Sequence, residues 1–155
     1  MYGRESAIFY HDDNGDFCIV VATSPHKVVV VDENHTQIAL YQRSVTALVV
    51  ELVAFDSPDE SIAYLRENST DLLLLDLAMT ENDGLSWLRE MRNIKRHAET
   101  PVVVVTSKDY AQDRIVAKKL GAIDYLVKPL RSQEIREIIC AHIKAQFKDD
   151  GLAVP

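Results

Sequence analysis

Residues 71–76 read Asp-Leu-Leu-Leu-Leu-Asp, the segment of the 155-residue chain that is most informative about its fold. Four consecutive leucines cannot alternate between an apolar and a polar face. They therefore predict a strand covered on both sides, as in a parallel sheet wrapped by helices. In such sheets ligands bind in the crevice beyond the carboxyl ends of the strands. Asp76, which closes the run, stands where a binding site is expected.

The rest of the chain from residue 28 onward alternates short β-branched or leucine-rich runs with helical stretches, the pattern of a doubly wound α/β domain. We predict strands at residues 28–32, 49–55, 71–76, 101–106 and 123–127. Helices are predicted at about 34–47, 58–67, 85–95, 110–120 and 132–147. Ser57 followed by Pro58 marks a helix start, and Gly121 marks a helix stop. The last helix carries an apolar stripe that ends at Phe147.

The composition is that of an ordinary globular protein, with 47% hydrophobic and 26% charged residues. The net charge of -7 argues against direct binding of a nucleic-acid backbone. No apolar run approaches the ~20 residues that span a membrane. Cys18 and Cys140 are far apart and flanked by apolar residues, which favours small buried hydrophobes over a disulfide. We expect a cytoplasmic protein that does not bind membranes.

Polar side chains stand at or just after the carboxyl ends of four of the predicted strands and are expected to meet at one edge of the sheet. They are Asp32 and Glu33, Asp76, Thr106, and Lys128. An aspartate at a strand end can be a helix cap, a metal ligand or a nucleophile. Crowded carboxylates repel one another unless a cation neutralises them, and Mg²⁺ prefers hard oxygen ligands. The pattern favours Mg²⁺ over zinc, because the sequence has no cluster of His and Cys ligands. It favours Mg²⁺ over calcium, because the sequence has no twelve-residue loop with the ligand spacing of a helix–loop–helix calcium site.

A carboxylate beside such a metal can attack a phosphoryl group and form an aspartyl phosphate. Phosphoryl transfer requires cations and donors around the equatorial oxygens. Lys128 can supply a charge, and Thr106 can supply a hydroxyl donor. The same residues taken singly are ordinary surface or strand residues, so the functional interpretation depends on the joint pattern.

Residues 27–148 resemble the receiver domain of two-component response regulators. The resemblance rests on five elements in order: the acidic pair Asp32 and Glu33, Asp76 with Asp83-Gly84 after it, Thr106, Tyr125, and Lys128-Pro129. It implies a flavodoxin-like five-stranded parallel sheet with strand order 2-1-3-4-5. It also implies a cis peptide bond before the proline.

The resemblance further implies a phosphorelay function. Asp76 would take a phosphoryl group from a phosphohistidine on a histidine kinase or phosphotransfer protein. Mg²⁺ would be held by Asp32, Glu33, Asp76 and the backbone carbonyl of Ala78. Lys128 would pair with the phosphoryl oxygens, and Thr106 and Tyr125 would form the switch. Such a domain is not an enzyme beyond self-phosphorylation and slow autodephosphorylation.

Two positions depart from the family pattern. Glu33 replaces the commoner second aspartate, and Thr80 stands where a proline is usual. A phosphatase with an aspartate nucleophile is disfavoured because its general acid would be expected at position 78, which is alanine. The stronger alternative is a receiver-fold interaction module that signals without phosphorylation. The output effector and the cognate kinase are not indicated by the sequence.

Residues 1–26 precede the α/β alternation and predict a hairpin with a turn at Asn14-Gly15. An isolated hairpin is marginal in water, so it is either a cover for the domain or an element that contacts another chain. We expect Ile8 and Tyr10 to share one apolar face with Phe17, Ile19 and Val21, which favours a homodimer. The domain organisation expected is a hairpin extension at 1–26, a receiver domain at 27–148 and a tail or linker start at 149–155.

Overall fold

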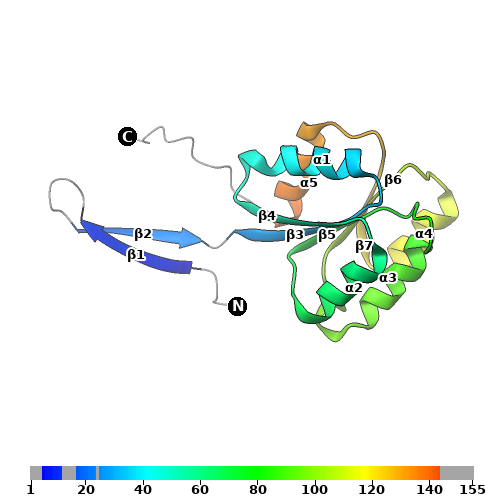
Figure 1. Ribbon diagram of the computed structural model, residues 1–155, viewed down its shortest axis with the longest axis horizontal. Coiled ribbons are helices and arrows are strands. Elements are labelled where there is room, and N and C mark those ends of the chain that lie inside the picture. Colours follow the sequence, from blue (N-terminus) through cyan, green and yellow to red (C-terminus); the bar gives the residue numbers. More distant parts are fainter. Residues whose placement is uncertain (1–4, 12–16, 24, 144–155) are drawn as a thin grey trace.

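The computed structural model describes residues 5–11, 17–23 and 25–143, and it describes side chains only in the last of these ranges. Two separate sheets are present in these residues, a two-stranded hairpin and a five-stranded sheet (Figure 1). The five-stranded sheet consists of β3 (His26–Val31), β4 (Val50–Phe55), β5 (Leu72–Leu75), β6 (Val102–Thr106) and β7 (Ala122–Val127). Its order is β4-β3-β5-β6-β7, and all neighbouring strands are parallel. The predicted 2-1-3-4-5 order is confirmed.

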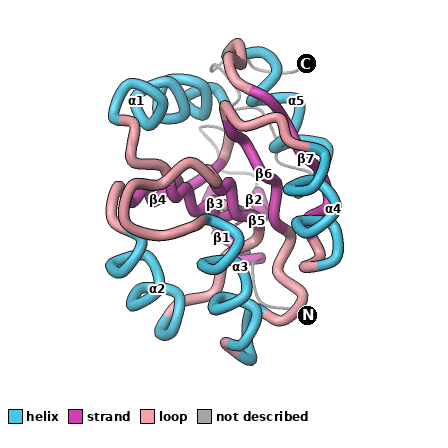
Figure 2. Tube along the Cα trace, turned by 90° about the vertical axis from the view of Figure 1, so that its right-hand side faces the viewer, coloured by secondary structure: helices cyan, strands magenta, loops and turns pink. Residues whose placement is uncertain are grey.

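In the described part of the chain, four helices connect successive strands, a fifth follows the last strand, and together they cover both faces of this sheet. They are α1 (His35–Ser44), α2 (Pro58–Glu67), α3 (Gly84–Asn93), α4 (Ala111–Lys119) and α5 (Ser132–Ile143), with 3₁₀ turns η1 (Val45–Ala47) and η2 (Lys95–His97). Helices α1 and α5 lie on one side of the sheet, and α2 and α3 lie on the other (Figures 1 and 2). The predicted helix at 34–47 is an α-helix only to Ser44, after which the chain tightens into η1.

The core is divided by the sheet into two apolar clusters. Val29, Leu73 and Leu75 contribute to the cluster under α2, α3 and α4, whereas Leu72 and Leu74 contribute to the cluster under α1 and α5. All four leucines of β5 are at most 2% exposed. The expectation that this strand is covered on both faces is confirmed, because successive side chains of a strand point to opposite faces.

The predicted helix signals act as expected where the structure describes them. Ser57 accepts a hydrogen bond from the Glu60 N–H at 3.3 Å, and Pro58 is the first residue of α2. Gly121 follows α4 with a φ of 85°, a conformation that favours glycine. Buried isoleucines at 135, 139 and 143 form the stripe of α5, while Phe147 lies outside the described residues.

The hairpin is formed by β1 (Glu5–His11) and β2 (Phe17–Thr23), which pair antiparallel, and the turn predicted at Asn14-Gly15 lies outside the described residues. Figure 1 shows it extending away from the helices, beyond the amino-terminal ends of the parallel strands. The register pairs Phe9 with Ile19 and Ile8 with Val20. Directly opposed residues share a face.

This register corrects the expected apolar face of the hairpin. The face that carries Ile8 and Tyr10 carries Cys18 and Val20 on the other strand, whereas Phe17, Ile19 and Val21 share the opposite face with Ala7, Phe9 and His11. The expected grouping was wrong. Alternation with a period of two shows which residues of one strand share a face, but the pairing register decides which residues of the partner strand lie on that face. Both faces of the hairpin are therefore rich in apolar residues.

Among the described residues, no helix is long and apolar enough to cross a bilayer.

Candidate functional site

Asp32 and Asp76 follow two neighbouring strands, β3 and β5, at the carboxyl edge of the sheet. The chain leaves β3 for β4 on one side and later returns to β5 on the other, so the order reverses here, which is where doubly wound sheets bind ligands. The Asp76 N–H donates to the Val31 carbonyl at 3.0 Å, which ties the two strand ends together. Both aspartates are buried, at 2% and 6% exposed.

Lys128 joins the two buried carboxylates. Its Nζ lies 2.7 Å from Asp32 Oδ2 and 2.9 Å from Asp76 Oδ2. The Lys128 N–H donates to the Thr106 carbonyl at 2.9 Å, so the end of β7 is fixed against β6. The Lys128–Pro129 peptide bond is cis, as the resemblance implies. A single ammonium group thus meets two carboxylates in a largely buried setting, where the attraction is much stronger than in water.

The second oxygens of the two aspartates are engaged by backbone amides. Asp32 Oδ1 accepts from the Asn34 N–H at 2.8 Å, and Asp76 Oδ1 accepts from the Ala78 N–H at 2.9 Å. Burial raises the pKa of Asp32, and the nearby Asp76 charge acts in the same direction. The hydrogen bonds from Lys128 and Asn34 oppose this change but do not cancel it. Added positive charge nearby would therefore favour the ionised form of Asp32.

The Glu33 carboxylate does not lie together with the carboxylates of Asp32 and Asp76. Its Oε2 accepts a 2.9 Å hydrogen bond from the Thr80 N–H and a second bond from the Thr80 hydroxyl. Thr80 belongs to the loop between β5 and α3, so the bond spans the two loops that carry Asp32 and Asp76. Among the residues with described side chains, no group of three or more His, Cys, Asp or Glu is close enough to form a ready metal cluster.

The loop after Asp76 is tightly closed. Ala78 and Asp83 form an isolated antiparallel bridge, and the Asp83 side chain caps α3 through the Leu85 N–H at 3.3 Å. A Cβ on Gly84 would lie 2.4 Å from Leu77 Cα and 2.9 Å from the Asp76 carbonyl oxygen. Glycine is therefore required here by close backbone approach, which explains the Asp-Gly pair noted in the sequence.

Thr106 and Tyr125 are connected through Lys108. The fully buried Thr106 hydroxyl accepts from the Lys108 N–H at 3.2 Å, and the Tyr125 hydroxyl donates to the Lys108 carbonyl at 2.6 Å. The Arg114 guanidinium lies over the Tyr125 ring at 4.5 Å from its centroid. Sequence reasoning missed Lys108 and Arg114. Lys108 acts through its backbone, which gives no sequence signal.

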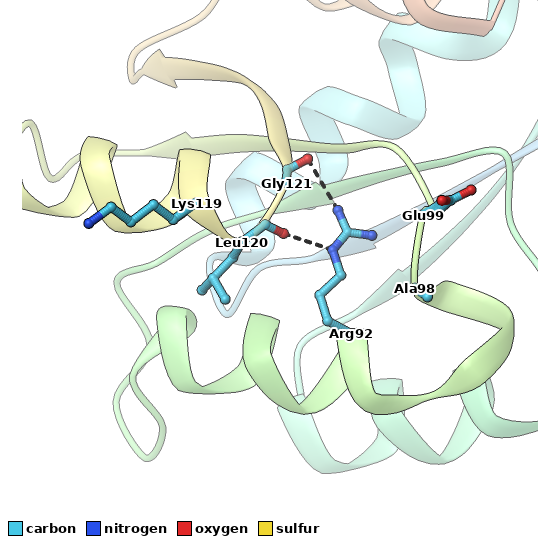
Figure 3. Close-up of a pocket in the computed structure, with 6 residues that line it drawn as sticks. All are labelled: Arg92, Ala98, Glu99, Lys119, Leu120 and Gly121. Carbon is cyan, nitrogen blue, oxygen red and sulfur yellow. Dashed lines mark hydrogen bonds between the residues drawn. The ribbon is translucent and has the colours of Figure 1, made fainter.

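A cavity of about 430 Å³ lies at the opposite, amino-terminal edge of the sheet, where the chain enters β6 and β7. Figure 3 shows Arg92 reaching from α3 to the carbonyls of Leu120 and Gly121. The same guanidinium donates to the carbonyls of His97 and Thr100, at 2.9 and 2.7 Å. Burial lowers the pKa of Arg92. The donors of Arg92 are thus used to join three chain segments, and this cavity is separate from the aspartate site.

Comparison with known families identifies this architecture. The family model described as "Response regulator receiver domain" matches residues 28–140, and the chain belongs to this family. The predicted family is thereby confirmed.

Two curated relatives of the chain are longer proteins. The chain is 31% identical over 111 residues to the cyclic di-GMP phosphodiesterase response regulator RpfG of Xanthomonas campestris. It is 32% identical over 117 residues to the transcriptional regulatory protein CpxR of Klebsiella pneumoniae. These matches cover 70% and 71% of this chain, but only 29% and 46% of the two relatives. The chain therefore spans less than half the length of these relatives.

Solved structures show the same fold. The phosphorylated cyanobacterial phytochrome response regulator RcpA matches with a TM-score of 0.71 and 24% identity, over 81% of this chain and 99% of that one. The Mn²⁺-bound response regulator Rcp1 matches with a TM-score of 0.69 and 21% identity, over 84% and 99%. The receiver domain of the histidine kinase PA1611 from Pseudomonas aeruginosa, with magnesium in its cleft, matches with a TM-score of 0.69 and 21% identity, over 77% and 98%.

Proposed function

We propose that this receiver domain accepts a phosphoryl group on Asp76 from a phosphohistidine of a histidine kinase or phosphotransfer protein. The observation that carries the proposal is the ammonium group of Lys128, which lies 2.9 Å from Asp76 Oδ2 and 2.7 Å from Asp32 Oδ2. A buried carboxylate beside a fixed cation, at the switch point of a doubly wound sheet, is suited to form an aspartyl phosphate.

The residues present have distinct roles in this reaction. An Asp76 oxygen attacks phosphorus, the phosphorus–nitrogen bond of the donor breaks, and the freed imidazole takes up a proton. Lys128 remains beside the phosphorylated oxygen and neutralises charge on the phosphoryl group. The Ala78 N–H bonds to Asp76 Oδ1 and fixes the orientation of the carboxylate. Transfer is thereby favoured by positioning and charge neutralisation.

A divalent cation, Mg²⁺, fits the donor set. The carboxylates of Asp32 and Asp76 are hard oxygen ligands, and the raised pKa of Asp32 reflects a buried acid that lacks full charge compensation. Glu33 and the carbonyl of Ala78 are the further ligands that we propose. The cation would neutralise negative charge on the transferring phosphoryl group. The Mn²⁺-bound Rcp1 and the PA1611 receiver domain, with magnesium in its active-site cleft, support a divalent cation at this site.

We also propose that phosphorylation changes the position of Thr106 and Tyr125. A separate proposal concerns the domain organisation: a hairpin extension at 1–26, a receiver domain at 27–148 and a tail at 149–155. The effector of the phosphorylated state is an output domain or separate protein. Two longer relatives, named as a cyclic di-GMP phosphodiesterase response regulator and a transcriptional regulatory protein, support an output of this kind.

Mass spectrometry of the intact protein tests the phosphoacceptor. With Mg²⁺ and acetyl phosphate, the mass should rise by one phosphoryl group. Asp76→Asn should abolish the increase, whereas Asp59→Asn, a change at an exposed position in the first turn of α2, should not. Equal labelling of the Asp76→Asn protein would contradict the assignment.

Thermal unfolding tests the cation. Mg²⁺ at 100 times its Kd should stabilise the wild type by about 2.7 kcal/mol, because it binds only the folded state. Asp32→Asn removes one of the two buried oxygen ligands and should abolish most of this increment. An equal Mg²⁺ response in both proteins would contradict the proposed ligand set.

A further inference from the structure

The fold pairs Glu33 with Thr80, the two residues that differ from the pattern implied by the resemblance. The Thr80 N–H lies 2.9 Å from Glu33 Oε2, and the Thr80 hydroxyl bonds to the same oxygen. A proline at position 80 has neither donor, because its ring nitrogen carries no hydrogen. The two departures therefore form a single interaction.

The position of Thr80 is fixed by its loop. Ala78 bridges to Asp83, the Met79 N–H donates to the Leu77 carbonyl at 3.1 Å, and Gly84 packs against the backbone of Leu77. The Thr80 side chain is exposed, but the direction of its N–H is set by this closed turn. A donor that is fixed in this way loses little conformational entropy when it binds a carboxylate.

The three acids of the site are thus divided between two partners. Lys128 holds Asp32 and Asp76 at 2.7 and 2.9 Å, whereas Thr80 holds Glu33 on the neighbouring loop. Hydrogen bonds to an ionised carboxylate are stronger than those between neutral groups. A cation that draws Glu33 toward Asp32 and Asp76 must therefore break two such bonds.

We propose that Thr80 is a positioning residue that holds Glu33 away from Asp32 and Asp76 and so lowers the affinity of the site for Mg²⁺. This inference rests on the proposed function, because it concerns the cation that assists phosphorylation. Thr80 acts through Glu33 and touches neither the cation nor the phosphoryl group. Its effect is to raise the Mg²⁺ concentration at which the site is filled.

Calorimetric titration of the full chain with Mg²⁺ measures this effect. Thr80→Pro removes both donors and should lower the Kd for Mg²⁺ about tenfold, equivalent to about 1.4 kcal/mol. Thr80→Val keeps the N–H and should lower the Kd about threefold, since one of two charge-assisted bonds remains. Thr46→Val is the matched control, because Thr46 is exposed, follows α1, and donates a hydrogen bond from its hydroxyl to the Arg43 carbonyl in the last turn of that helix. Its Kd should equal that of the wild type.

A double-mutant cycle and amide exchange separate this role from a general structural effect. Glu33→Asp shortens the side chain by one methylene and withdraws it from Thr80, so in that background Thr80→Pro should change the Kd less than about twofold. Saturating Mg²⁺ should also accelerate exchange of the Thr80 amide hydrogen in the wild type. An unchanged or higher Kd in Thr80→Pro, or an unaltered Thr80 exchange rate, overturns the proposal and leaves the cation site intact. Absence of Mg²⁺ binding in every variant overturns both this inference and the proposed cation.

Discussion

The hydroxyl of Tyr125 donates a 2.6 Å hydrogen bond to the Lys108 carbonyl. The N–H of the same Lys108 residue donates to the Thr106 hydroxyl at 3.2 Å. A movement of Thr106 toward a phosphoryl group on Asp76 would therefore act on Tyr125 through one backbone segment. This connection gives the proposed switch a physical route, because the segment between β6 and α4 carries both contacts.

The first prediction concerns this route. Thr106→Val removes the hydroxyl while filling the fully buried site, whereas alanine would leave a cavity. The lost bond to a phosphorylated Asp76 is worth roughly 1.5–3 kcal/mol before reorganisation. Labelling of Asp76 should survive, but the phosphorylation-dependent change in amide exchange around Tyr125 should disappear. Retention of that change in Thr106→Val would exclude Thr106 as the switch.

The second prediction concerns the pH dependence of stability. Burial raises the pKa of Asp32 in the folded protein above the ordinary value of 3.8. The folded state then binds this proton more tightly than the unfolded state, so the contribution of Asp32 to stability is greatest below the unfolded pKa and is lost as pH rises through the folded pKa.

Denaturant unfolding from pH 7 to pH 4 measures this contribution. As pH falls, the wild type should gain stability relative to Asp32→Asn, by roughly 1 kcal/mol for each unit of pKa difference. In this variant Asp76 remains available to pair with Lys128, whose Nζ lies 2.9 Å from Asp76 Oδ2 in the wild type. A stability difference that is constant with pH, or that moves in the opposite direction, would refute the assignment.

The third prediction concerns Gly84. Gly84→Ala places a Cβ 2.4 Å from Leu77 Cα and 2.9 Å from the Asp76 carbonyl oxygen, so the strand end that carries Asp76 must move. We expect a loss of stability of about 3 kcal/mol or more, because backbone atoms cannot give way locally. Acetyl-phosphate labelling should also slow.

Gly121→Ala is the matched control for Gly84. Its φ of 85° strains any other residue by roughly 1–2 kcal/mol, but it lies at the opposite edge of the sheet. It should lower the denaturation midpoint without slowing the labelling of Asp76. If both alanine variants were labelled at the wild-type rate, the close approach at Gly84 would have no bearing on the site.

The fourth prediction concerns the hairpin. Within the described residues β1 and β2 pair only with each other, and their register places apolar residues on both faces. Two apolar faces and open strand edges favour pairing with a second chain over a one-sided cover. Deletion of residues 1–24 should convert a dimer into a monomer in light scattering, while labelling of Asp76 survives. If the 155-residue chain were monomeric at high micromolar concentration, the proposed dimer would be contradicted.

Much of the α/β domain follows from local patterns in the sequence. The leucines of 72–75 predict a strand buried on both faces, and Ser57 and Gly121 predict helix ends, because each of these signals depends only on neighbouring residues. The position of Asp32 and Asp76 at one edge also follows, since parallel strands that alternate with helices must all end on the same side.

Pairings across the chain were decided by the tertiary structure. Glu33 and Thr80 are 47 residues apart, and nothing in the local pattern of either predicts the hydrogen bonds between them. The contacts of Thr106 and Tyr125 with Lys108 use its backbone N–H and carbonyl, which do not depend on the lysine side chain. The composition of each hairpin face depends on the pairing register of β1 and β2, and alternation within one strand does not specify that register. Local sequence patterns thus indicate which residues reach the carboxyl edge of the sheet. Which of these residues touch depends on the distances between loops in the folded chain, and no local pattern encodes those distances.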